Sequence, residues 1–165
     1  MKKAFILVSI LSLALFAAAV NFSGSWELDR SKSELPDPGQ GPGGRGFGGF
    51  TAPKMKVTQE ANSLTIERTM VGFDGNERTI TTTTTLDGKV TKTSNERGES
   101  EVKAEWKDKA LVIDTLRKFQ GQMGSFESKR VETWKLSADG KELTIEFTQS
   151  SPRGDMKGKA VYIKK

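Results

Sequence analysis

Residues 21–29 read Asn-Phe-Ser-Gly-Ser-Trp-Glu-Leu-Asp, and this stretch decides how the rest of the 165-residue chain is arranged. Its alternate positions are Phe22, Gly24, Trp26 and Leu28. Such alternation is the period of a strand with one buried face, and a glycine in a strand lets a large ring or another backbone come close. One strand cannot bury the indole of Trp26 alone, so the stretch predicts a sheet that curls back over it.

The chain beyond residue 53 reads as short strands joined by tight turns. Asp-Gly, a strong hairpin signal, occurs at residues 74–75, 87–88 and 139–140, and residues 81–85 are five threonines, which favour strands. No long stretch shows the 3.6-residue period of a helix. With the first strand included, ten strands are expected, the others at residues 54–59, 64–71, 76–85, 89–95, 99–107, 110–118, 126–136, 141–149 and 157–164.

Consecutive hairpins form a meander, and a meander of this length must close on itself or leave its edges open. We therefore predict an all-β fold, an antiparallel up-and-down barrel of about eight to ten strands.

The first strand and the meander together resemble the calycin barrels, which include the lipocalins and the fatty-acid-binding proteins. The likeness begins with Phe-x-Gly-x-Trp, in which Gly24 and Trp26 are the structural motif. The resemblance implies that Trp26 plugs the closed end of the barrel under a cationic side chain. The alternative is that Trp26 lines a ligand.

A closer resemblance is to small exported bacterial lipocalin-like proteins of uncharacterised function, and it covers about residues 21–165. It rests on three phrases, Ser-Gly-Ser-Trp-Glu-Leu-Asp-Arg-Ser-Lys-Ser at residues 23–33, Glu-Thr-Trp-Lys-Leu-Ser-Ala-Asp-Gly-Lys-Glu-Leu-Thr-Ile at residues 132–145, and Lys-Ala-Val-Tyr-Ile-Lys-Lys at residues 159–165.

Residues 1–19 have the three parts of a secretory signal. Lys2 and Lys3 form a basic start, an apolar run follows, and residues 17–19 are alanines that suit cleavage. The alternative is a retained anchor, because the apolar run is close to the short limit for a membrane span. We expect a cleaved signal peptide at residues 1–19, one domain at residues 20–165, no membrane span after cleavage, and a periplasmic or extracellular protein.

Residues 36–53 interrupt the strands with seven glycines. Packing cannot offset the entropy of ordering such a composition, so we predict a flexible Gly/Pro-rich loop. Phe47 and Phe50 leave two interpretations open: a flap whose rings touch the barrel mouth or a ligand, or a disordered insertion.

Charged and aromatic side chains share the strand faces that carry the apolar residues. Arg68 falls in phase with Ile66, and Arg130 and Glu132 fall in phase with Trp134. The candidate ligand-binding residues on these faces are Arg68, Arg78, Trp106, Arg130, Glu132 and Trp134. Arginine can bind a carboxylate through two parallel hydrogen bonds, so the pattern suits an amphipathic ligand with an anionic end. The alternative is that the arginines lie at the rim, paired with Glu132 or with solvent.

The resemblance also bears on the last strand. Fatty-acid-binding proteins use an Arg-x-Tyr pair there to hold a carboxylate. The matching stretch in this chain is Ala160-Val161-Tyr162, so only Tyr162 carries over as a candidate.

Composition argues against catalysis and against nucleic-acid binding. The chain has no cysteine and no histidine, which removes disulfides, thiolate chemistry and the commonest general base. Glu132 has no evident inward acidic partner, and no metal-ligand or nucleotide motif occurs, so we expect no enzyme, no metal and no cofactor. Without Lys2 and Lys3 the formal net charge falls from +5 to +3, too weak a basic balance to argue for nucleic acid.

The sequence therefore favours non-enzymatic binding of a small hydrophobic or amphipathic molecule in a barrel cavity. The alternative is a structural or protein-interaction role in the cell envelope, with a packed barrel and no ligand. A pocket lined by Trp106, Trp134 and Arg130 favours the first reading, and a filled interior favours the second.

We predict that the exported protein begins at Val20 or within about two residues of it, because signal peptidases cleave after small residues such as Ala17–Ala19. Intact-mass measurement of protein recovered outside the cytoplasm checks this. Retention of residues 1–19 would contradict the prediction.

Overall fold

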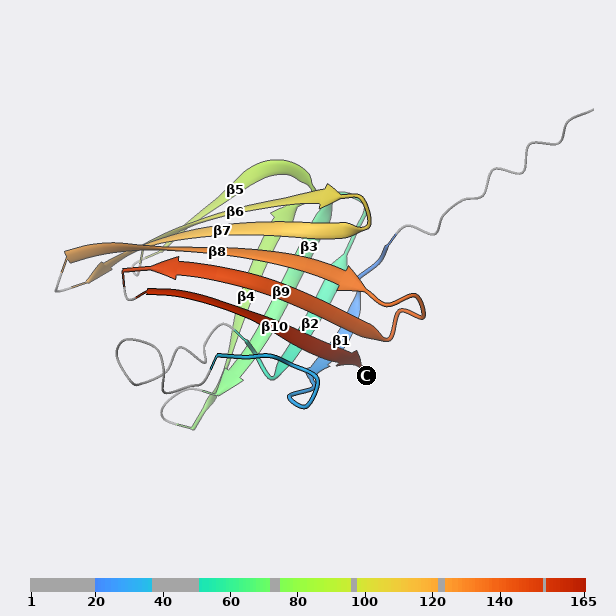
Figure 1. Cartoon of the computed structure of the whole chain (residues 1–165). Coiled ribbons are helices and arrows are strands. Elements are labelled where there is room, and N and C mark those ends of the chain that lie inside the picture. The colour runs from blue at the N-terminus through green and yellow to red at the C-terminus, as the bar shows by residue number, and fades with distance from the viewer. Residues whose placement is uncertain (1–19, 37–50, 72–74, 96–97, 122–123, 153) are drawn as a thin grey trace, which may run out of the picture.

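The structure is a computed structural model, and it describes residues 20–36, 51–71, 75–95, 98–121, 124–152 and 154–165. Ten antiparallel strands make up the described fold, as the sequence predicts (Figure 1). They are β1 Gly24–Leu28, β2 Lys54–Gln59, β3 Ser63–Val71, β4 Glu77–Thr85, β5 Asp87–Asn95, β6 Gly98–Lys107, β7 Ala110–Gly121, β8 Gly124–Leu136, β9 Glu142–Ser151 and β10 Gly154–Lys164. The segments 1–19 and 37–50 lie outside the described residues, so the signal peptide and most of the predicted flexible loop stay predictions.

The strands form one sheet in the order β4-β3-β2-β1-β10-β9-β8-β7-β6-β5. Its two edges, β4 and β5, are consecutive in the chain, so the sheet curls round until they approach each other and form a nearly closed barrel (Figure 1). The described residues of β4 and β5 share no backbone ladder. Near their junction the Thr84 hydroxyl on β4 lies 3.3 Å from the Thr91 hydroxyl on β5.

The expectation of a hairpin at residues 87–88 is therefore wrong. Asp87 and Gly88 lie inside β5 and not in a turn. The register between β5 and β6 shifts between Asp87 and Val90, and Gly88 has a φ of 76°. This bulge bends the start of β5, and the strand pairs with β6 instead of β4.

The chain after β1 continues along β10. The strand β1 pairs with β10 only from Leu28–Tyr162 to Trp26–Lys164. Beyond that point Glu34 exchanges two backbone hydrogen bonds with Lys159, of 2.7 and 2.8 Å. The segment between β1 and the predicted loop thus covers the edge of β10 that the short β1 leaves unpaired.

An aromatic cluster fills one end of the barrel, which we call the aromatic end. The ring of Phe22 stacks on Trp106 with centroids 5.7 Å apart and meets Trp134 edge-on at 5.6 Å. Trp26 is 1% exposed, and its indole N–H donates to the carbonyl oxygen of Phe22 over 2.9 Å. The opposite end of the barrel is where β7 ends at Gly121 and β8 begins.

The spacing of Gly24 and Trp26 has a physical reason in this cluster. The ammonium of Lys164 lies 5.4 Å from the centroid of the Trp26 ring, within the range of a cation–π contact. A Cβ at Gly24 would stand 2.6 Å from the Lys164 stem, and the φ of Gly24 is +147°. A side chain at this position would therefore have a strained backbone conformation and would have to displace the Lys164 stem from its place over the tryptophan.

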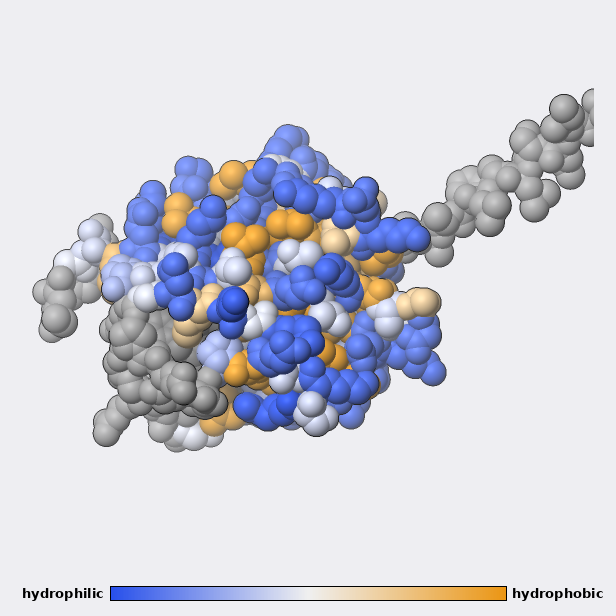
Figure 2. Space-filling view, viewed as in Figure 1, coloured by the Kyte–Doolittle hydropathy of each residue, from blue (hydrophilic) through white to orange (hydrophobic). Residues whose placement is uncertain are grey.

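The outer face of the barrel carries paired charges. Figure 2 shows hydrophilic residues spread over this face, with hydrophobic ones between them. Lys135 contacts Glu146 at 3.1 Å across neighbouring strands, and Lys92 contacts Glu101 at 2.9 Å. Exposed pairs of this kind add little stability, so the fold depends on its interior.

None of the described segments contains a helix that is both long enough and apolar enough to cross a membrane.

We predict that Trp26→Ala lowers the free energy of unfolding by about 3–5 kcal/mol, the usual cost of emptying a large core site. Urea denaturation measures this. Val71→Ala is the control, because Val71 is 61% exposed and should shift the free energy by less than about 0.5 kcal/mol. A loss below about 1 kcal/mol for Trp26→Ala would mean that the ring is not part of the core.

Candidate functional site

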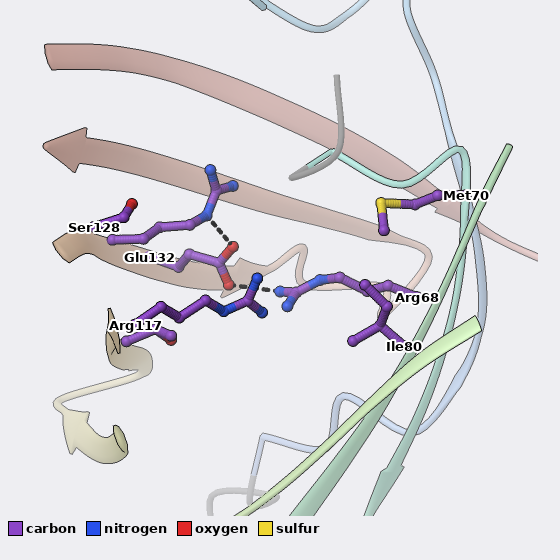
Figure 3. A pocket seen from close by; sticks show the side chains of 8 residues that line it. Arg68, Met70, Ile80, Arg117, Ser128 and Glu132 are labelled. Atoms are coloured by element: carbon purple, nitrogen blue, oxygen red, sulfur yellow. Dashed lines mark hydrogen bonds and ion pairs between the residues drawn. The ribbon is translucent and has the colours of Figure 1, made fainter. Parts of the chain in front are cut away.

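A buried carboxylate on β8 holds together side chains from opposite walls of the barrel (Figure 3). Glu132 accepts a hydrogen bond from Arg68 Nη2 at Oε2 and one from Arg130 Nε at Oε1, each 2.7 Å long. The indole N–H of Trp134 donates to the same Oε2 over 3.0 Å. The two arginines and the tryptophan therefore use both oxygens of one carboxylate.

The strand period explains this arrangement. Residues at alternate positions of a strand share a face, so β8 directs Arg130, Glu132 and Trp134 into the interior. Arg68 lies on β3, which is not a neighbour of β8 in the sheet. Its side chain therefore reaches Glu132 across the barrel and not along the sheet.

The charges of this cluster are almost fully buried. Glu132 is 4% exposed and Arg130 is 8% exposed. Burial acts to raise the pKa of Glu132, but the charges of Arg68 and Arg130 and the hydrogen bonds from Arg130 and Trp134 outweigh it and lower the pKa to about 2. Glu132 is therefore ionised at neutral pH.

Arg130 also contacts groups on β9. Its guanidinium carbon lies 4.1 Å from the centroid of the Phe147 ring, and Nη1 donates to Gln149 Oε1 over 3.4 Å. The amide nitrogen of Gln149 donates in turn to Ser128 Oγ over 3.3 Å. This polar layer extends the cluster from Glu132 toward the end of the barrel opposite the aromatic cluster.

A small cavity adjoins the cluster, with a volume of about 30 Å³, enough for about two water molecules. It is lined by Arg68, Met70, Ile80, Thr115, Arg117, Ser128, Arg130 and Glu132. Figure 3 shows the guanidinium groups of Arg68 and Arg117 pointing toward the Glu132 carboxylate. Three guanidinium groups and one carboxylate thus line the cavity, which gives its wall a formal charge of +2.

Arg117 is a site residue that our sequence analysis did not single out. Burial, and then the positive charge of Arg68, lower the pKa of Arg117, while Glu132 opposes this shift; an arginine still stays protonated in a protein. The available signal was the alternation of residues 111, 113, 115 and 117, because Leu111 and Ile113 are buried. Assigning the faces of β7 in this way places Arg117 in the interior.

The structure brings together four of the predicted site residues, Arg68, Arg130, Glu132 and Trp134. Trp106 lies in the aromatic cluster instead, against Phe22. Arg78 is exposed on β4, and it is not among the residues that line the cavity.

Tyr162 is buried, and it is not among the residues that line the cavity. Its hydroxyl donates to the carbonyl oxygen of Ala52 over 3.0 Å, and burial raises its pKa to about 12. In this structure Tyr162 anchors the chain that enters β2.

The sequence predicts a pocket lined by Trp106, Trp134 and Arg130, but the cavity lies elsewhere in the barrel. Both indoles pack with Phe22 at the aromatic end, and the cavity is lined by Arg130 but by neither tryptophan. Within the described residues no group of three or more acidic side chains could hold a metal ion.

Comparison with known proteins relates the fold to barrels of solved structure. No protein-family model and no curated protein matches the sequence. The structure is similar to the zebrafish ileal bile acid-binding protein complexed with cholic acid, with a TM-score of 0.56 and 17% identity, covering 87% of this chain and 98% of that one. A secretory abundant heat soluble protein from Ramazzottius varieornatus gives a TM-score of 0.54 with 14% identity, over 87% and 94% of the two chains.

A third similar structure is the REP1-NXSQ fatty acid transporter, with a TM-score of 0.53 and 12% identity, covering 87% of this chain and 96% of that one. At such identities the likeness establishes the fold alone. The chain has a calycin-type barrel fold.

We predict that acid removes the stability supplied by Glu132. Its pKa is lowered in the folded state from an ordinary value of 4.5 to about 2, so its contribution is present above about pH 4.5 and is lost as the pH falls toward 2. The loss should be on the order of 3 kcal/mol, measured by urea denaturation across this pH window.

Glu132→Gln is the test variant, and Glu146→Gln, an exposed partner of Lys135, is its matched control. At neutral pH Glu132→Gln should cost about 3–5 kcal/mol, because it leaves buried guanidinium groups without their carboxylate. The control should cost less than about 1 kcal/mol. A Glu132→Gln protein as stable as the control, with an unchanged pH profile, would contradict the prediction.

Proposed function

We propose that this protein binds a small amphipathic molecule with an anionic group, and that the arginine-lined cavity holds the anionic group. Binding is non-enzymatic. The ligand class is a carboxylate attached to a hydrophobic body.

The observation that carries the proposal is the charge of the cavity wall. Arg68, Arg117 and Arg130 converge on one carboxylate, that of Glu132. Like charges repel strongly where water is scarce, so an added anion lowers the electrostatic energy of this wall. A guanidinium also matches a carboxylate geometrically, through two parallel N–H···O bonds.

The structural neighbours support the same ligand class. One is named as a fatty acid transporter, and another is a bile acid-binding protein complexed with cholic acid. Both names describe proteins that bind or transport amphipathic acids. Catalysis by this chain would have to proceed without cysteine or histidine.

The proposal includes export. Residues 1–19 have the pattern of a cleavable signal, and residues 20–165 form the domain that would act in the periplasm or outside the cell. A barrel released from the membrane in this way could carry its ligand through an aqueous compartment.

One observation favours the alternative, a structural or protein-interaction role in the envelope. The aromatic end is filled by Phe22, Trp106 and Trp134, and the cavity beside the arginines measures only about 30 Å³. A cavity of this size cannot hold the hydrophobic part of a ligand. Unless that part binds elsewhere on the protein, the barrel is a packed structure without a ligand site.

We predict that Arg117→Gln weakens the binding of medium- and long-chain carboxylates by roughly 10- to 100-fold, equivalent to about 1.5–3 kcal/mol for a charged hydrogen bond. Arg78→Gln is the matched control, since Arg78 is exposed on β4 and does not line the cavity. Titration followed by tryptophan fluorescence measures both, because Trp134 adjoins the site.

The probe panel includes fatty acids, bile salts and neutral retinoid-like alcohols. The carboxylates should bind and the neutral probes should bind more weakly. Failure of every probe to bind the unmodified protein at about 100 μM, a threshold of only about 5.5 kcal/mol, would favour the interaction role.

A further inference from the structure

A second, larger opening lies where the sheet fails to close. Between β4 and β5, and reaching β6 and β7, there is a half-open cleft with a volume of about 630 Å³. It follows from the topology, because β4 and β5 are the two edges of the sheet (Figure 1). A bulge bends the start of β5, and the described residues of β4 and β5 share no ladder pairs.

The cleft and the arginine-lined cavity share part of their walls. Ile80 and Arg117 line both. A ligand group seated against Arg117 in the cavity therefore has the cleft directly beside it, and Ile80 lies between the two on the β4 side.

The inner wall of the cleft is suited to a hydrocarbon chain. Ile80 is 40% exposed there, and Val102 and the ring of Phe119 line the other side. Thr82 adds its methyl group on β4. Because the cleft is half open, the backbone groups of the two strand edges keep their contact with water while a chain packs on these side chains.

The aromatic end offers no alternative place for such a chain. The Phe22 ring is 0% exposed and contacts both Trp106 and Trp134. Trp134 is also hydrogen-bonded to Glu132, so the aromatic cluster directly adjoins the charged groups. A chain attached to a head group at the arginines cannot extend toward the aromatic end without displacing these rings.

We infer that the β4–β5 cleft is the tail-binding site for a single-chain amphipathic carboxylate, whose head lies in the arginine-lined cavity. The tail leaves the barrel sideways, between the two edges of the sheet, and packs on Ile80, Val102 and Phe119. This inference rests on the proposed function, because it assumes that an anionic head group occupies the cavity.

The test is a chain-length series of unbranched carboxylates, from about eight to about sixteen carbons, titrated against the full-length mature protein. Each methylene that enters the cleft should tighten binding by up to about fourfold. Phe119→Ser is the main variant, because Phe119 lines the cleft. It should flatten the dependence on chain length while the shortest carboxylate still binds.

Phe126→Ser is the matched control. The rings of Phe119 and Phe126 stack with centroids 4.9 Å apart, so both substitutions remove the same ring contact. Only Phe119 is among the residues that line the cleft, and Phe126→Ser should keep the chain-length dependence of the unmodified protein. Thr82→Phe is a second variant that fills the cleft instead of widening it, and it should weaken the binding of long chains most.

The outcomes separate the two proposals. If carboxylates bind and require Arg117, but Phe119→Ser and Thr82→Phe leave the chain-length dependence unchanged, the cleft is not the tail site and the proposed function stands. If no carboxylate of any length binds, the proposed function fails and the tail site fails with it.

Discussion

The interaction on which this barrel depends is the contact of the buried Glu132 carboxylate with Arg68 and Arg130. The Glu132 carboxylate is 4% exposed, and the cost of burying it is offset by two hydrogen bonds of 2.7 Å from the arginines and a third from Trp134. A buried ion pair is seldom a net gain over apolar packing, so we attribute to it a positional role. It links β3 to β8, which are not neighbours in the sheet, and so fixes the distance between opposite walls.

This charged layer divides the interior into two parts. On one side the rings of Phe22, Trp106 and Trp134 pack together. On the other side the wall carries Arg117 as well, and the space continues past Ile80 into the gap between the sheet edges. The gap between the sheet edges thus adjoins the cavity that carries the excess positive charge. The anionic head group of a ligand would bind in the arginine-lined cavity, and its apolar tail would bind in the adjacent cleft.

Much of this could be predicted from the sequence, because a period of two fixes which residues share a face. That rule placed Arg130, Glu132 and Trp134 on one inward row, and Arg68 on another. It could not show that Arg68 reaches Glu132, since the contact spans 64 residues and depends on how far the sheet curls. The Asp-Gly pair at residues 87–88 has the same local pattern as a true hairpin, so the bulge in β5 and the gap beside it were not predictable. Trp106 was misplaced because alternation gives a face but not a depth in the barrel.

If the excess positive charge around Glu132 holds an anionic head group, the arginines should keep the carboxyl group of a bound ligand ionised. The ionisation can be followed by NMR as the pH is lowered, with a medium-chain fatty acid labelled with ¹³C at its carboxyl as the ligand. We expect the bound carboxyl to stay ionised at about pH 4, below the ordinary pKa range of a carboxylic acid. A bound carboxyl that titrates at the same pH as the free acid, or higher, would show that the head group does not lie among the arginines.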